Sequence, residues 1–274
     1  MSAFMICCAF CAGIIGALTG AFQECLLGGI IGVLSVLFPE KAILEMVLCN
    51  GFIPYVAFTG AVAGTAFASK VRKHDLSGAA ILTSLNRFND IFVLIISGLV
   101  AVASLAFVTL LNKTGLVMDM GSISVIVISC LVRIFWGDGK FWNKNIKKIS
   151  RYTNHKIEWI YLFSLGCLGG LMAGYIGKYT GNVWIPFYLS LASLIFYFLE
   201  PNFPPSHHIS CTAAYAYLAT GSLLAAAIWG GIAQCLMTFL GDAINTDAST
   251  HIDPPATTIG ILSILIFIIY HVIL

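Results

Sequence analysis

The stretch IFVLIISGLVAVASLAFVTLL at residues 91–111 contains no charged side chain and no proline. An apolar run of about 20 residues forms a helix long enough to cross the hydrocarbon core of a bilayer. Lipid cannot hydrogen-bond to the backbone, whereas a helix satisfies its own amide and carbonyl groups. The stretch therefore predicts a membrane-spanning helix.

The whole chain of 274 residues has the same character, with 59% hydrophobic and 9% charged residues. Soluble chains carry about 25% charged residues, and so few charges could not cover a water-exposed surface. The predicted fold class is an all-α, polytopic transmembrane helix bundle of about 8 to 10 membrane segments. A net charge of +2 excludes a broad basic surface for nucleic acid. The expected partners are the lipid bilayer and a small molecule or ion; homo-oligomerisation stays open, and no cofactor is expected.

The candidate spans follow the apolar runs of the sequence. They cover residues 4–22, 25–38, 42–69, 90–111, 118–136, 158–177, 183–200, 209–240 and 256–273. Two of them have unusual lengths. The run at 25–38 is short, and the run at 209–240 is long enough to tilt or to fold as a full span plus a partial one.

Two basic clusters predict the orientation of the chain. The first is the loop at 70–74, and the second is the loop at 137–157, which holds six lysines and arginines. Two candidate spans separate them, so both loops fall on one side of the membrane. Cytoplasmic loops carry an excess of Lys and Arg, which predicts that both loops are cytoplasmic in a multi-pass protein of the plasma (inner) membrane.

The second basic loop divides the chain into an N-terminal membrane half at 1–136 and a C-terminal membrane half at 158–274. Both halves begin with glycine-rich runs, and each contains a break with proline, at 50–54 and at 202–205. Paired interruptions in corresponding halves indicate a binding site near the membrane midplane of transporters built from inverted repeats. We therefore expect two repeat-related halves with interrupted helices.

These two breaks supply the predicted substrate-binding residues. Pro54 removes a helical donor and frees a backbone carbonyl, which leaves either a site for solute or a simple kink. Ser206 is a candidate cap for the helix that follows, and a helix N-terminus suits an anion; the alternative is an interfacial loop. The predicted substrate-binding residues are Asn50, Pro54, Asn202, Ser206, His207 and His208.

Ionisable residues in apolar surroundings indicate ion or proton pathways. Glu24 lies between two apolar runs, either at a hairpin turn among headgroups or facing a cavity. A second group falls within twelve residues near the C-terminus, and a solvated loop would explain it equally well. The predicted coupling or gating residues are Glu24, Asp242, Asn245, Asp247, His251 and Asp253. Their spacing fits neither a calcium loop nor a zinc hydrolase motif, so no metal site is predicted.

The C-terminal third carries a family resemblance. The segments EPNFPPSHHISCTAAYAYL at 200–218 and THIDPPATTIGILSIL at 250–265 resemble the HPP family of integral membrane proteins, which is linked to nitrite transport. The family's T-x-H-P-P-A-G-A-T-A segment would fall on Thr250, His251, Pro254, Pro255, Ala256 and Thr257. Two departures stand out: Ile252 and Asp253 separate the histidine from the prolines, and Thr257 replaces a glycine. The resemblance implies transport of an anion or another small solute.

The predicted function is therefore a membrane transporter or channel for a small solute, with a small anion such as nitrite favoured by the resemblance. Coupling to a proton or a cation is part of this hypothesis. No catalytic residue is assigned, and the chain is not expected to be an enzyme. The rival interpretations are a metal-dependent integral membrane enzyme and a non-transporting membrane scaffold subunit.

Overall fold

The computed structural model describes residues 1–38, 51–143 and 156–273. Within these ranges the chain is helical and contains no strand, which confirms the all-α prediction. Four helices are long and apolar enough to cross a membrane. They are α5 (Ile91–Asn112), α8 (Lys156–Thr180), α12 (Leu223–Asn245), and α13 (Pro254–Phe267) with its π-helical continuation η3 (Ile268–Ile273).

The chain forms two compact units, and each unit contains a short segment from the other half of the sequence. Unit 1 comprises Met1–Leu116, Met120–Phe141 and Asp247–Asp253, and unit 2 comprises Val117–Asp119, Trp142–Thr246 and Pro254–Leu274. The exchanged segments are therefore Val117–Asp119 and Asp247–Asp253. Each of them directly precedes a helix, α6 (Met120–Trp136) and α13 respectively.

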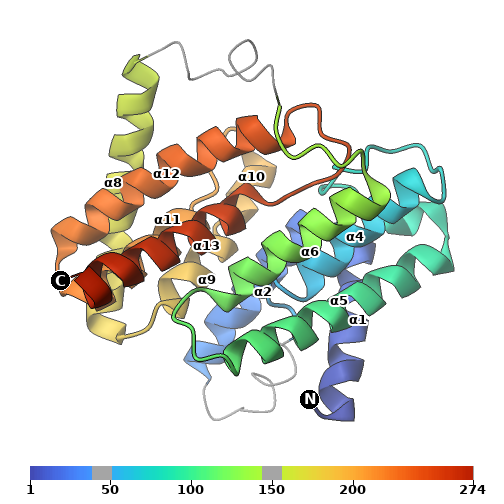
Figure 1. Ribbon diagram of the computed structural model, residues 1–274, viewed down its shortest axis with the longest axis horizontal. Coiled ribbons are helices and arrows are strands. Elements are labelled where there is room, and N and C mark those ends of the chain that lie inside the picture. The colour runs from blue at the N-terminus through green and yellow to red at the C-terminus, as the bar shows by residue number, and fades with distance from the viewer. Residues whose placement is uncertain (39–50, 144–155, 274) are drawn as a thin grey trace. The chain divides into compact units, whose positions relative to one another are not determined.

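In unit 1, α1 (Ala3–Thr19), α4 (Ala57–Lys70) and α5 contact one another pairwise (Figure 1). The helix α2 (Ala21–Leu37) packs on α1 and α4, and α6 packs on α4 and α5. Small residues allow these close contacts. A Cβ at Gly16 would lie only 2.7 Å from the carbonyl oxygen of Ala57.

In unit 2, α8, α11 (His207–Thr220) and α12 likewise contact one another pairwise (Figure 1). The helix α9 (Trp184–Ala192) packs on α8 and α11, and α13 packs on α11 and α12. Gly166 of α8 faces Gly230 and Gly231 of α12 at the closest approach. The backbones meet there because neither helix presents a side chain.

The contact at Gly166 yields a stability prediction. A Cβ at Gly166 would lie 2.7 Å from the Cα of Gly231 and 2.8 Å from the Cβ of Gln234, so Gly166→Ala must separate α8 from α12. We expect a loss of about 1–3 kcal/mol in the free energy of unfolding, as for other overpacked cores. Thermal unfolding of the purified protein in detergent measures this.

Gly177→Ala in the same helix is the matched control. A Cβ at Gly177 would meet its neighbours at 3.8 to 4.0 Å, which is ordinary van der Waals contact. Alanine is the better helix former by about 1 kcal/mol, so this variant should unfold at or above the wild-type temperature. Equal midpoints for the two variants would contradict the close approach of α8 and α12.

Several predicted spans differ from the observed helices. The run at 209–240 is two helices, because Gly221 adopts a left-handed φ of 68° and ends α11, and Ser222 caps α12 by accepting from Ala225 N–H at 3.2 Å. The run at 183–200 is α9 followed by the short α10 (Ile195–Leu199). Of the run at 42–69, the described part is helical only from Ala57.

The loop between α4 and α5 is fastened to α5 by Asp90. This carboxylate accepts from the backbone N–H of Phe92 at 3.0 Å and so caps α5. It also pairs with Arg72 at 2.6 Å and His74 at 2.9 Å. Burial raises the pKa of Asp90, but the hydrogen bonds from Arg72, His74 and Phe92 outweigh it and lower the pKa from 3.8 to about 2.

This lowered pKa predicts an acid sensitivity. A carboxyl whose pKa is lower in the folded state stabilises the fold above its unfolded pKa. That contribution is present above pH 3.8 and is lost as the pH falls through about 2. Asparagine still caps a helix, so Asp90→Asn removes mainly the ion pairs. The gap in unfolding midpoint between wild type and Asp90→Asn should shrink from neutral pH to about pH 2; a constant gap would contradict the assignment.

Candidate functional site

Among the described residues of unit 1, Glu24 is the most buried acidic residue. It lies in the first turn of α2 and is 0% exposed. Neither of its carboxylate oxygens has a hydrogen-bond partner within the described residues. A lone buried carboxylate is costly in free energy unless it is protonated or bound to a cation. The arrangement therefore suits a group that takes up a proton or a cation.

The turn into α2 explains why Glu24 points inward. Gly20 has a φ of 105°, a backbone conformation that glycine adopts without strain. This turn lets α2 begin directly after α1. The start of α2 is then covered by the loop before α5, because Phe22 N–H donates to Ile81 at 3.1 Å and Gln23 Nε2 donates to Leu82 at 2.8 Å. The alternative of a headgroup-exposed hairpin turn at Glu24 is thus wrong.

The first proline break lies against the same face of α2. Gly28 is one turn after Glu24, and a Cβ there would collide with the carbonyl oxygen of Phe52 while lying 3.6 Å from Glu24 Oε1. Pro54 sits in the irregular segment before α4, and its carbonyl accepts from Thr59 N–H at 3.3 Å. The predicted site residue Asn50 lies outside the described residues.

The exchanged segment Asp247–Asp253 adds two more ionisable groups to unit 1. His251 packs edge-on against Phe58 of α4 with 6.1 Å between ring centroids, and its Nε2 lies 3.4 Å from Asp253 Oδ1. Asp253 in turn lies within electrostatic range of Cys25, the residue after Glu24. Unit 1 therefore brings Glu24, His251 and Asp253 together, although more than 220 residues of sequence separate them.

Arg133 of α6 holds this segment in place and was not among the predicted site residues. Its side chain is 0% exposed. Nε donates to Thr250 Oγ1 at 3.2 Å, Nη2 donates to the Thr250 carbonyl, and Nη1 donates to the Lys140 carbonyl at 3.3 Å. Ser249 is anchored separately, by a 2.8 Å hydrogen bond to Asp138. The feature of the sequence that could have identified Arg133 is its position within the apolar run 118–136.

The predicted coupling residues near the C-terminus are divided between the two units. Asp242 and Asn245 belong to the last turns of α12 in unit 2. Asp247 belongs to unit 1 but is exposed and has a left-handed φ of 56°. Of this group, His251 and Asp253 pack within unit 1, with Asp253 within electrostatic range of Cys25, the residue after Glu24.

In unit 2, the predicted residues of the second break have separate environments. His208 is fully buried, and its Nε2 lies 2.9 Å from Gln234 Oε1 of α12. His207 packs edge-on against Phe187 with 6.2 Å between centroids. Ser206 occupies the N-cap position of α11, but its side chain makes no capping hydrogen bond, so that expectation was wrong. Asn202 is exposed and donates to Glu200 Oε1 at 2.8 Å.

Unit 2 also contains a buried acidic residue that sequence reasoning missed. Asp119 is 6% exposed, and its Oδ2 accepts a 2.7 Å hydrogen bond from the hydroxyl of Tyr215. Within the described residues, no three His, Cys, Asp or Glu side chains gather as a metal site.

The comparisons with known proteins place the chain in a family. Residues 137–274 match the model of a family described as a family of unknown function (DUF7973), and the chain belongs to this family. No curated protein and no solved structure matches the chain.

Proposed function

We propose that this chain is a multi-pass membrane transporter or channel for a small solute, coupled to a proton or a cation through Glu24. The observation that carries the proposal is the fully buried carboxyl of Glu24, which has no hydrogen-bond partner within the described residues and shares unit 1 with His251 and Asp253. Ionisable residues among apolar helices are expensive and typically serve ion or proton movement.

The contacts within unit 1 support cytoplasmic basic loops at 70–74 and 137–157. Asp138 in the second loop bonds to Ser249, and Gly78, just after the first loop, packs against the carbonyl of the same residue. The two loops thus meet one segment, as expected if both lie on one side of the membrane. Their positive charge makes that side the cytoplasmic one.

The helix contacts support two inverted repeats. The order α1, α2, α4, α5, α6 in unit 1 has the same pairwise contacts as the order α8, α9, α11, α12, α13 in unit 2. α4 and α11 each have 14 residues and each follows a break with proline. With five membrane segments per repeat, the number found in the described residues, the second repeat would be inverted relative to the first.

A solute would bind at the N-terminus of a short helix: in unit 1 that of α4, next to Pro54, and in unit 2 that of α11, next to His207. A helix of 14 residues is about 21 Å long, at 1.5 Å per residue, which is shorter than the hydrocarbon core of about 30 Å, and we place its N-terminal end inside the membrane. Such a half-helix directs free amides and a positive dipole at its ligand. The resemblance to the HPP family adds support for a small anion such as nitrite.

Flux measurements in proteoliposomes test the proposal. We expect the full-length chain to carry nitrite, or protons under a pH gradient, faster than empty liposomes. His207→Ala should reduce nitrite flux, whereas Asp75→Asn, at an exposed loop position, should not. A folded, monodisperse protein that carries neither nitrite, protons, sodium nor potassium would refute the proposal. Stoichiometric zinc or manganese in the purified protein would instead favour the enzyme interpretation.

A further inference from the structure

Asp119 occupies a position in unit 2 that corresponds to that of Asp253 in unit 1. Each aspartate is the last residue of an exchanged segment, and each directly precedes the final long helix of its half, α6 or α13. The Asp119 side chain reaches Tyr215 and Cys211 of α11, with Oδ2 2.7 Å from the Tyr215 hydroxyl and 3.9 Å from the Cys211 sulfur. Its backbone N–H donates to Ser263 Oγ of α13 at 3.0 Å.

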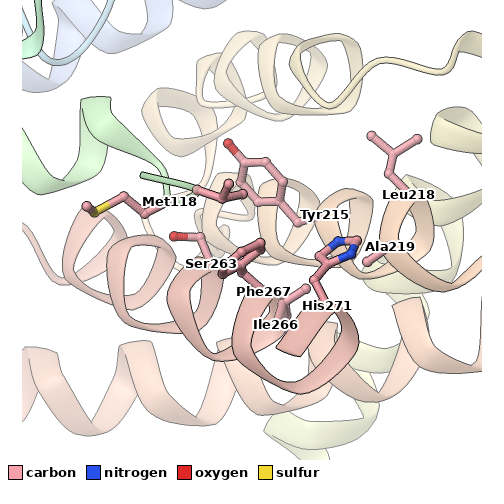
Figure 2. Close-up of a pocket in the computed structure, with 9 residues that line it drawn as sticks. Met118, Tyr215, Leu218, Ala219, Ser263, Ile266, Phe267 and His271 are labelled. Atoms are coloured by element: carbon pink, nitrogen blue, oxygen red, sulfur yellow. The ribbon is translucent and has the colours of Figure 1, made fainter. Parts of the chain in front are cut away.

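A cavity of about 200 Å³ adjoins this cluster. Its wall includes Tyr215 and Ser263 together with Met118, the residue before Asp119, and Phe267. Figure 2 shows the hydroxyls of Tyr215 and Ser263 at one end of the cavity and His271 at the other. Asp119 itself does not line the cavity, so the Tyr215 side chain connects the cavity to the carboxylate.

Tyrosine suits the role of a connector because its hydroxyl donates one hydrogen bond and accepts others. The donated bond goes to Asp119, and the phenol oxygen keeps a lone pair that can accept from a water molecule. The cavity volume exceeds the roughly 30 Å³ that one water molecule occupies in the liquid. Among the described residues, the titratable groups around Asp119 include Tyr215 and Cys211 from α11, and His271 from η3 lies in the wall of the cavity.

We infer that Asp119 is a second proton-binding site, which exchanges its proton with water in this cavity through the Tyr215 hydroxyl. In one concerted transfer, a hydronium ion in the cavity gives a proton to the phenol oxygen of Tyr215 and leaves as water, while the original O–H bond of Tyr215 breaks and its proton binds Oδ2 of Asp119. Asp119 then carries one proton, and Tyr215 is restored.

The inference rests on the proposed function for its biological meaning, because each repeat would then have one acidic site beside its exchanged segment. Glu24 with Asp253 would serve unit 1, and Asp119 with Tyr215 would serve unit 2. Proton binding by Asp119 can be measured without transport, because it depends only on the carboxyl group and its surroundings. The test therefore uses a readout that requires no flux.

Infrared difference spectra of the full-length protein between neutral and acidic pH test the inference. Acidification should produce a carboxylic acid C=O stretching band that is absent in Asp119→Asn. Tyr215→Phe removes the hydrogen bond to that carboxyl and should shift the band to higher frequency. Asp75→Asn should leave the band unchanged, and Glu24→Gln should remove a different one.

A wild-type set of carboxyl bands in Asp119→Asn would overturn the inference. If Asp119→Asn fails to fold, Tyr215→Phe decides, because an unshifted band in that variant has the same consequence. The two proposals fail separately. An Asp119 band in a protein without flux refutes only transport, and flux without that band refutes only this site.

Discussion

Glu24→Gln should strongly reduce proton-coupled transport and leave the protein folded. Glutamine is nearly isosteric with a protonated glutamate but cannot bind or release a proton. Loss of a buried group that balances an ion costs about 3 kcal/mol, which corresponds to about a 100-fold fall in coupled flux. The folded state should tolerate the change, because Glu24 makes no hydrogen bond within the described residues that the variant would lose.

Flux driven by a pH gradient, recorded with a pH-sensitive dye inside proteoliposomes, measures the effect. Glu24→Asp retains the charge and should retain a slower, still pH-dependent flux. Nitrite exchange without a pH gradient should persist in Glu24→Gln, because this mode moves no net proton. Wild-type rates and pH dependence in Glu24→Gln would remove Glu24 from the mechanism, whatever the thermal stability of the variant.

The helical class of this protein follows from composition, but the burial of Glu24 does not. A continuous apolar run such as 91–111 satisfies its backbone hydrogen bonds in lipid by forming a helix. The helix α5 matches that run closely. Glu24 fitted two environments in the sequence, a hairpin turn among headgroups and a position facing a cavity. The left-handed turn at Gly20 and the approach of Phe52 to Gly28 decide between them, and both depend on tertiary packing.

The acidic residues near the C-terminus show how proximity in sequence misleads. Asp242 and Asp253 lie within twelve residues, which suggested one shared site. The chain leaves α12 at Thr246, however, and the next seven residues pack into unit 1. Asp119 was overlooked for the converse reason, because its partners Tyr215 and Ser263 lie far along the chain. Hydrogen bonds between distant segments leave no periodic signal in a single sequence.

Arg133→Met should cause the largest loss of stability among single substitutions near the site. Methionine fills a similar volume but donates no hydrogen bond, so the carbonyls of Thr250 and Lys140 lose their guanidinium donor. Each buried acceptor left without a donor costs about 1–3 kcal/mol, and relief from burying the charge offsets part of this. We expect a net loss of about 3 kcal/mol in the free energy of unfolding, within the range of broken buried networks.

Arg87→Met is the matched control, because Arg87 is exposed and donates to the Asp75 carbonyl at 2.9 Å. Exposed substitutions of this kind change stability by about 0.5 kcal/mol or less. Arg133→Lys should fall between the two, since one ammonium cannot reproduce the fork that binds both atoms of Thr250. Thermal unfolding in detergent ranks the three variants, and equal midpoints for Arg133→Met and Arg87→Met would contradict the anchoring role.

Hydrogen–deuterium exchange then separates a local role of Arg133 from a global one. If the guanidinium anchors the exchanged segment Asp247–Asp253, its backbone amides should exchange faster in Arg133→Met while those of α5 stay protected. His251 and Asp253 would lose their fixed positions near Glu24, so coupled flux should fall together with the protection. A variant with unaltered exchange at 247–253 but impaired flux would mean that Arg133 acts on the solute or the ion directly. In Glu24→Gln the same amides should remain protected, because that change removes a proton site and leaves the anchor intact.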